Sequence, residues 1–353
     1  MRKHSYSLDA FRVLAIFGVF FTHLNFYNEG LRGEQTLLEG AVLNIGGLAA
    51  HFFILLSAFL IAYSYEKGIS YGYMTYVKKR ARRLLPVNIV TLPFYITVVV
   101  YIGFYTLSLG RSVLDIVLSS LLLQELFKFS AKLFNTPSWT ISTLFILYLI
   151  TPLLMWPLQR IRKPWIFIAI VVLLTWGDVE YRTWLTEIKP DNWWLNYASP
   201  INRILSYTNG LVLGCAARAC VCPSGISKHI TWIELVIFGI FFYGCVLIEE
   251  DYETCHYLVQ YTMPILIALC YIEKGMITRF IAASKINEAS PYVYAFYMSH
   301  FFFILLAYTI CDRVLGIWGN MSMMQVLFMV VATFVSACAA SVLLHHCVEK
   351  RIA

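Results

Sequence analysis

Residues 7–27 read SLDAFRVLAIFGVFFTHLNFY, a stretch long enough to cross a lipid bilayer as one helix. It nevertheless contains Arg12 and His23. A helix turns about 100° per residue, so this spacing places both side chains on nearly the same face, about 16 Å apart along the axis. Such groups cost several kcal/mol in lipid, so we expect them to line a polar cavity. Asp9, one turn before Arg12, favours this over an alternative in which the two side chains reach opposite membrane interfaces.

The rest of the chain has the same apolar character. Of its 353 residues, 59% are hydrophobic and 13% are charged, and the mean hydropathy is +0.69. Apolar runs of about 17–25 residues recur far more often than a soluble core needs. The sequence predicts a single all-α domain over 1–353, a polytopic transmembrane helix bundle. We expect about ten spans, near 8–27, 41–65, 84–107, 139–158, 164–177, 201–217, 231–249, 256–272, 290–311 and 321–345.

One further apolar stretch, 113–127, is short for a span and carries Asp115, Gln124 and Glu125. We predict a short helix there that does not cross the membrane. With both termini cytoplasmic, only a minority of the 27 Lys and Arg residues then lie outside, namely Arg32, Arg111, Lys128, Lys132, Arg182, Lys189 and Arg313. Apart from Arg12 and Arg203 within spans, the others lie inside, as cytoplasmic loops require. Counting 113–127 as a span would reverse the later loops.

The largest predicted outer loop, about 178–200, is rich in aromatic residues: Trp184, Trp193, Trp194 and Tyr197. Trp and Tyr at this depth usually form a belt at the membrane interface. They could also offer stacking faces to sugar rings. The sequence leaves both interpretations open.

On the predicted inner side, residues 78–86 read KKRARRLLP. Arg80, Arg82 and Arg83 have forked guanidinium groups that suit phosphate oxygens better than lysine does. The cluster therefore indicates a phosphate-bearing ligand, and the alternative is an ordinary topology signal before a span. Nucleic acid is not an expected partner, because no folded basic domain surrounds the cluster.

Several segments, in order, resemble the bacterial acyltransferase-three membrane proteins. The start resembles their Leu-Asp-x-x-Arg-(x)10-His helix, and HFFILLSAFLIAYSY (51–65) resembles their second span, with Ala58 where the family often has Gly. The basic run resembles their Arg-x-x-Arg-x-x-Pro motif through Arg80, Arg83 and Pro86. Two later stretches also resemble spans of the family. INRILSYTNGLVLG (201–214) resembles their Arg-then-Gly span, and SPYVYAFYMSHFFFILL resembles their Ser-x-x-x-Tyr-x-x-His segment through His300.

The resemblance extends from residue 7 to 351 and has one departure. Many members carry a Ser-x-x-Glu after the central Trp, whereas this chain reads SWTISTLFILY with no carboxylate after Trp139. Any role of that glutamate would pass to another acid such as Glu125.

The resemblance implies transfer of an acyl group, commonly acetyl, from cytoplasmic acyl-CoA to a hydroxyl of an envelope or lipid-linked sugar. The implied setting is the bacterial cytoplasmic membrane. We expect acyl-CoA as a co-substrate, no permanently bound cofactor and no metal. A neutral His23 could serve as the general base. Arg12 could polarise the thioester, hold phosphate or guide the acyl group. Arg80, Arg82 and Arg83 would bind the donor.

The remaining candidates are acceptor-binding or cavity residues: Asp9, His300, Arg203, Trp139 and Glu125. A glycan or small-molecule transporter is the alternative function, because polar residues within spans also mark transport paths. Such a protein would favour internal repeats with broken helices, and the sequence contains no convincing repeat.

Overall fold

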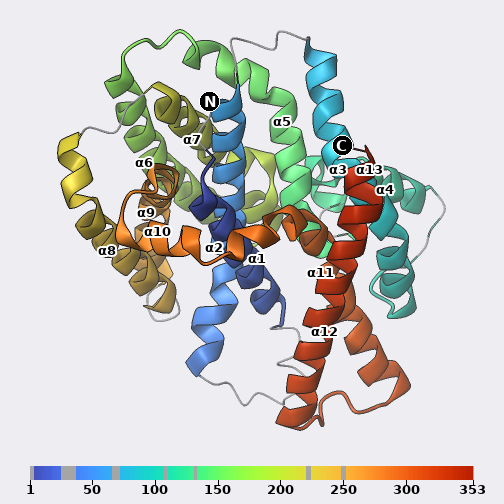
Figure 1. The fold of residues 1–353 in the computed structure, drawn as a ribbon. Helices are drawn as coiled ribbons and strands as arrows, with labels where there is room; N and C mark the ends of the chain where they lie inside the picture. Colours follow the sequence, from blue (N-terminus) through green and yellow to red (C-terminus); the bar gives the residue numbers. More distant parts are fainter. Residues whose placement is uncertain are drawn as a thin grey trace.

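The computed structural model describes residues 4–24, 37–65, 72–106, 108, 110–130, 133–219, 224–247 and 252–352. Within these ranges the fold is all-α (Figure 1). The main helices are α1 (Tyr6–His23), α2 (Leu37–Ser64), α3 (Tyr73–Tyr101), α4 (Arg111–Ser120), α5 (Trp139–Leu158), α6 (Pro164–Ile188), α7 (Pro200–Ala219), α8 (Ser224–Leu247), α9 (Tyr252–Ile272), α10 (Met276–Ala283), α11 (Val293–Thr309) and α12 (Met323–Leu344). Short 3-10 or π segments connect several of them, including η2 (Gln124–Leu126), η5 (Trp194–Ala198) and η6 (Ile286–Tyr292), and η8 (His345–Glu349) and α13 (Lys350–Ile352) end the chain.

Six helical stretches among the described residues are long and apolar enough to cross a membrane: Gly46–Ser64, Tyr73–Tyr101, Thr136–Leu158, Pro164–Ile188, Ile286–Val314 and Met323–Ile352. Two shorter apolar helices, His229–Cys245 and Tyr257–Ile272, accompany them. The predicted all-α membrane bundle is confirmed. The number of ten spans and the side on which each end lies remain predictions.

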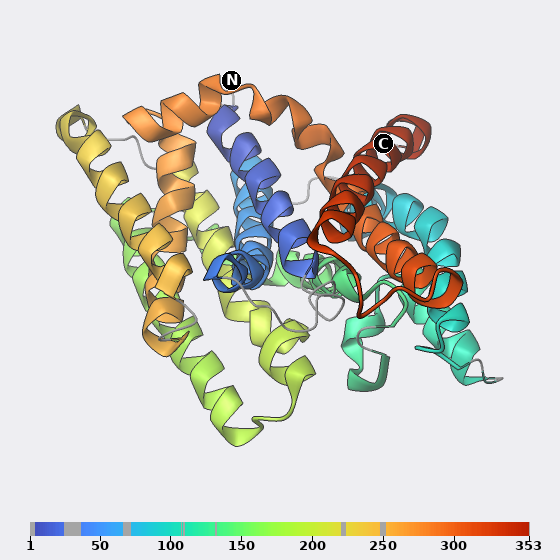
Figure 2. The same ribbon diagram turned by 90° about the horizontal axis from the view of Figure 1, so that it is seen from below.

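Helix α1 lies inside the bundle rather than at its edge (Figure 2). It packs against α2, α9, α10, η6 and α11. Its first turn is anchored by Ser5 and Ser7, whose hydroxyls both donate to the carbonyl oxygen of Cys270 on α9. Leu14 and Phe21 of α1 are exposed, whereas Arg12 and His23 contact Ser290 and His300 of the η6–α11 segment.

Helices α2 and α7 approach so closely that only small residues fit between them. A Cβ atom on Gly210 would meet the carbonyl oxygen of Leu55 and lie 2.7 Å from Cβ of Ala58. One turn on, a Cβ on Gly214 would lie 2.8 Å from Cβ of Ala62. This is the small-xxx-small packing by which membrane helices bring their backbones together.

Two helices extend beyond the predicted spans. Helix α3 begins at Tyr73 rather than residue 84, so the basic cluster is part of the helix. Helix α6 continues to Ile188 instead of ending near residue 177, so the first half of the predicted outer loop is helical. The short helix expected within 113–127 is α4 followed by η2, and at about 15 Å α4 is too short to cross.

The predicted side of the α5–α6 connection can be tested by chemical labelling. Helix α6 is about 37 Å long, enough to cross a hydrocarbon core of about 30 Å, and exposed Arg162 and Asp191 lie beyond its two ends. We expect an impermeant thiol reagent added outside intact cells to modify Asp191→Cys and not Arg162→Cys. Peptide mass spectrometry reads each position without removing the native cysteines. External labelling of Arg162→Cys would reverse the topology.

Candidate functional site

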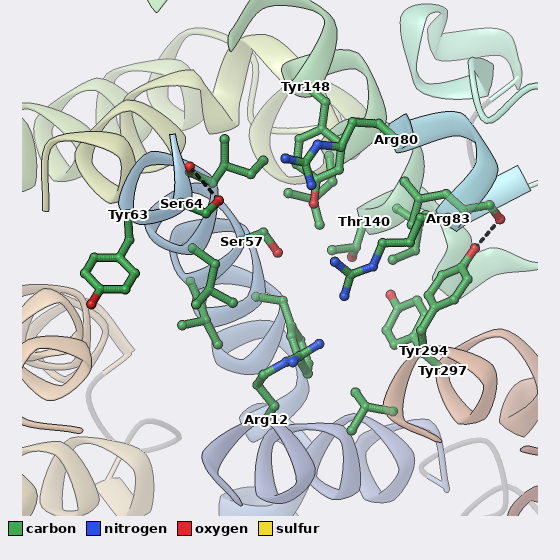
Figure 3. Close-up of a pocket in the computed structure, with 18 residues that line it drawn as sticks. Arg12, Ser57, Tyr63, Ser64, Arg80, Arg83, Thr140, Tyr148, Tyr294 and Tyr297 are labelled. Carbon is green, nitrogen blue, oxygen red and sulfur yellow. Dashed lines mark hydrogen bonds between the residues drawn. The ribbon is translucent and has the colours of Figure 1, made fainter. Parts of the chain in front are cut away.

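A cavity of about 360 Å³ lies between α1, α2, α3, α5 and the η6–α11 segment. Three arginines line it, Arg12 from α1 and Arg80 and Arg83 from α3, and their guanidinium groups point into the same space (Figure 3). The other polar lining residues are Ser57, Tyr63, Ser64, Thr140, Tyr148, Tyr294 and Tyr297, and the wall is completed by Phe53, Leu56, Leu60, Ile61, Leu84, Ile141, Leu144 and Val293. No Asp or Glu is among these lining residues. The cavity is therefore suited to an anionic group attached to an apolar or extended body.

The basic residues within 78–83 lie on α3, so their positions around the helix axis determine which of them reach the cavity. Arg80 and Arg83 are one turn apart and both line it, whereas Arg82 does not. Arg82 and Arg83 are both exposed, so it is the direction of each side chain that differs. The Arg80 guanidinium lies 5.3 Å from the ring centroid of Tyr76 and 5.6 Å from that of Tyr148. Its Nε atom is buried and has no hydrogen-bond partner among the described residues. A buried donor without a partner is costly, which points to a ligand that supplies an acceptor.

Arg12 is held at the cavity by its own helix and by the start of the α11 segment. Its Nη1 lies 3.3 Å from Oδ1 of Asp9 and donates to Oγ of Ser290 at 3.4 Å. The Ser290 hydroxyl donates to the same Asp9 oxygen at 3.0 Å. Asp9 thus orients Arg12, and Asp9 itself does not line the cavity.

At the far end of α1, His23 meets His300 of α11. Nδ1 of His23 lies 2.8 Å from the carbonyl oxygen of Val19, so this nitrogen carries the hydrogen and Nε2 carries the lone pair. Nε2 of His300 lies 3.3 Å from the same Nδ1. Arg12 and His23 thus share the predicted face, both turned toward the η6–α11 segment.

Neither histidine lines this cavity, and the role of His300 as an acceptor-binding or cavity residue stays a prediction. Arg12 and His23 are about 16 Å apart along α1. Arg12 therefore lies with Arg80 and Arg83, and His23 lies apart from them at the end of the helix.

The other three candidate residues form a separate buried group at the start of α5. The Arg203 guanidinium lies 5.6 Å from the ring of Trp139 and 4.9 Å from that of Tyr197, and its Nε donates to the Tyr197 carbonyl at 2.7 Å. Glu125 is fully buried there, and its backbone N–H donates to Oγ of Ser142 on α5. None of Arg203, Trp139 or Glu125 lines the arginine-lined cavity, and their predicted role as acceptor-binding or cavity residues stays a prediction.

The aromatic residues of the predicted outer loop divide into two kinds. Trp184 on α6 is 53% exposed and stacks with Tyr181, as a residue at a membrane interface does. Trp193 and Tyr197 instead are partly buried and pack against Trp139, and the belt and the sugar platform both stay predictions.

Two features of the site were missed in the sequence. Tyr294 and Tyr297 follow a helical spacing that continues to His300, which is a weak signal for one polar face. Asp178 and Arg182, expected in a loop, are buried on α6, where Asp178 accepts a hydrogen bond from Ser206 of α7. Arg182 donates to Nδ1 of His51 on α2 at 3.4 Å.

The comparisons with known proteins agree with this arrangement. A family profile described as an acyltransferase domain matches residues 5–342, from the anchor of α1 almost to the end of α12. The chain belongs to this family of acyltransferases. It is also 23% identical over 355 residues to acyltransferase MdmB of Streptomyces mycarofaciens, which covers 96% of this chain and 88% of the relative. No solved structure matches. The protein is thus a multi-pass membrane acyltransferase.

Proposed function

We propose that this acyltransferase moves an acyl group, most simply acetyl, from cytoplasmic acyl-CoA to a hydroxyl of an envelope or exported glycan. The setting proposed is the bacterial cytoplasmic membrane. The observation that carries the donor assignment is the convergence of Arg12, Arg80 and Arg83 on one cavity whose described lining contains no acidic residue. CoA is a polyphosphate joined to a long, narrow thioester arm, which matches an arginine-rich cavity and a distant base.

In this proposal, donor binding and proton transfer take place at different positions along α1. The arginines hold the phosphates, Arg12 among them, because Arg12 lies about 16 Å along the helix from His23. This location favours phosphate or donor binding by Arg12 over polarisation of the thioester at His23. The thioester arm then reaches toward His23, which removes the proton of the acceptor hydroxyl as that oxygen attacks the thioester.

In the proposed reaction His23 is the general base. Its Nε2 takes the proton of the acceptor hydroxyl as the oxygen attacks the thioester carbonyl carbon. The new C–O bond forms, the C–S bond breaks, and the sulfur leaves with the proton returned from Nε2. The products are the O-acyl ester and free CoA, and the histidine regains its neutral form.

The function can be tested in membranes that contain the native acceptor. We expect radiolabel from acetyl-CoA to enter the envelope glycan fraction only when the protein is present. Mild alkali should release the label, because an O-ester is cleaved under these conditions. Label transfer that is equal with and without the protein would contradict the proposal.

The arginine cluster provides a second test with an internal control. Arg80→Ala or Arg83→Ala should raise KM for acetyl-CoA about 10-fold, the loss of roughly one charge-assisted hydrogen bond, with a smaller effect on kcat. Arg82→Ala is the matched control: it removes the same charge from the same helix outside the cavity and should leave KM unchanged. Lysine should restore binding poorly because it lacks the bidentate fork. Equal KM values in all three alanine variants would mean that the arginines set the membrane topology and do not bind the donor.

A further inference from the structure

The carbonyl groups around the two histidines determine which ring nitrogens carry hydrogen. Nδ1 of His300 lies 2.8 Å from the carbonyl oxygen of Tyr297 and 3.2 Å from that of Phe296. A carbonyl oxygen can only accept a hydrogen bond, so Nδ1 of His300 is a donor. In the neutral ring, Nε2 of His300 is then an acceptor.

The same argument applies to His23, whose Nδ1 faces the carbonyl of Val19 at 2.8 Å. Nε2 of His300 lies 3.3 Å from this Nδ1. The Nδ1–H of His23 is therefore shared between one carbonyl oxygen and the lone pair of His300. A hydrogen on Nε2 of His300 would set two N–H groups against each other. With both rings neutral, the contacts agree with one arrangement, in which each ring carries its hydrogen on Nδ1.

The acceptor nitrogen of His300 is held in place by packing. His300 is completely buried, and its ring lies parallel to that of Phe296 at a centroid distance of 5.8 Å. The ring of Phe20 on α1 closes another side at 6.4 Å. His23, by contrast, is only partly buried. One histidine is thus completely buried between aromatic rings, and the other is partly exposed.

We infer that His300 is a positioning residue for the acyl transfer proposed above. It accepts the Nδ1–H of His23, directs Nε2 of His23 toward the acceptor hydroxyl, and stabilises the imidazolium that forms during attack. The proton moves from the hydroxyl to Nε2 of His23 and then to the departing sulfur, so His300 neither gains nor loses a proton. The role of His300 in acyl transfer rests on the proposed function. The positions of the hydrogens on the two rings rest on the contacts alone.

The kinetic test uses variants that distinguish the hydrogen-bonding role of Nε2 of His300 from the packing role of its ring. His300→Phe keeps a ring against Phe296 and removes both nitrogens. We expect kcat with acetyl-CoA to fall about 10- to 100-fold, because a hydrogen bond to a charged group is lost in the transition state. KM for acetyl-CoA should stay unchanged, because His300 does not line the donor cavity. His300→Gln supplies an acceptor oxygen near the position of Nε2 and should recover most of kcat.

Ser299→Ala is the matched control, since this buried neighbour bonds only to carbonyls of its own helix. It should retain wild-type kcat. A His300→Phe variant with more than half of wild-type kcat, or a folded His300→Gln variant no better than His300→Phe, would overturn the inference.

A spectroscopic test remains informative even if acetyl-CoA is not the donor. In protein labelled with ¹⁵N at histidine and reconstituted in nanodiscs, the ring nitrogens of His23 and His300 report their protonation directly. We expect both to be neutral with hydrogen on Nδ1, the tautomer that free histidine disfavours. Hydrogen on Nε2 of His300 would overturn the positioning role. If both rings carry hydrogen on Nδ1 and the protein transfers no acyl group, the proposed function is contradicted and the proton arrangement is not.

Discussion

Replacing His23 by Ala is expected to lower kcat for acyl transfer by about 10²- to 10⁴-fold, the usual contribution of a general base. The reason lies in the geometry of the ring. Its Nδ1–H is bonded to the Val19 carbonyl, which leaves the lone pair of Nε2 to receive a proton. Turnover of radiolabelled acetyl-CoA in membranes of matched protein content measures the effect.

The control for this substitution is His229→Ala, which removes an exposed histidine from α8. Both variants should insert into the membrane at wild-type abundance, and only the His23 variant should lose activity. KM for acetyl-CoA should be similar in all three proteins, because His23 does not line the donor cavity. If His23→Ala kept more than about half of the activity, another group would have to be the base.

The largest expected effect on stability comes from Gly210→Ala. In a helix this change normally stabilises by about 1 kcal/mol. Here the added methyl group would meet the Leu55 carbonyl and lie 2.7 Å from Cβ of Ala58, so α2 and α7 would have to separate. We expect a net loss of about 3 kcal/mol, the upper part of the usual range for overpacking, because the obstacle is backbone.

Gly239→Ala on α8 is the matched control, because a Cβ there meets no atom within 4 Å. Thermal unfolding in detergent, followed by size-exclusion chromatography, should show a lower melting temperature for the Gly210 variant only. Equal melting temperatures for the two variants would mean that α2 and α7 do not pack as closely as the structure has them.

Local features of the sequence were sufficient for the fold class and for part of the site. Hydropathy and segment length depend on composition, so the membrane bundle and the short helix α4 could be predicted. The spacing of Arg12 and His23 within one helix placed both on the face that meets the η6–α11 segment, because helical periodicity is a local property. The dense run of basic residues likewise predicted a ligand-binding role for Arg80 and Arg83, because charge density is also a local property of the sequence.

What the sequence could not supply was how the helices lie against one another. Hydropathy predicted that α6 ends before its first charged residues. Asp178 and Arg182 are instead buried on α6, where Ser206 of α7 donates to Asp178 and Arg182 donates to His51 of α2. Arg82 and Arg83 are the same residue type and are both exposed, and only their positions around the axis of α3 decide that Arg83 lines the cavity and Arg82 does not. The contact of His23 with His300, 277 residues apart, likewise depends on where α1 crosses α11. Membrane segments and helix faces are local properties of this chain, whereas the pairing of faces is a long-range result of packing.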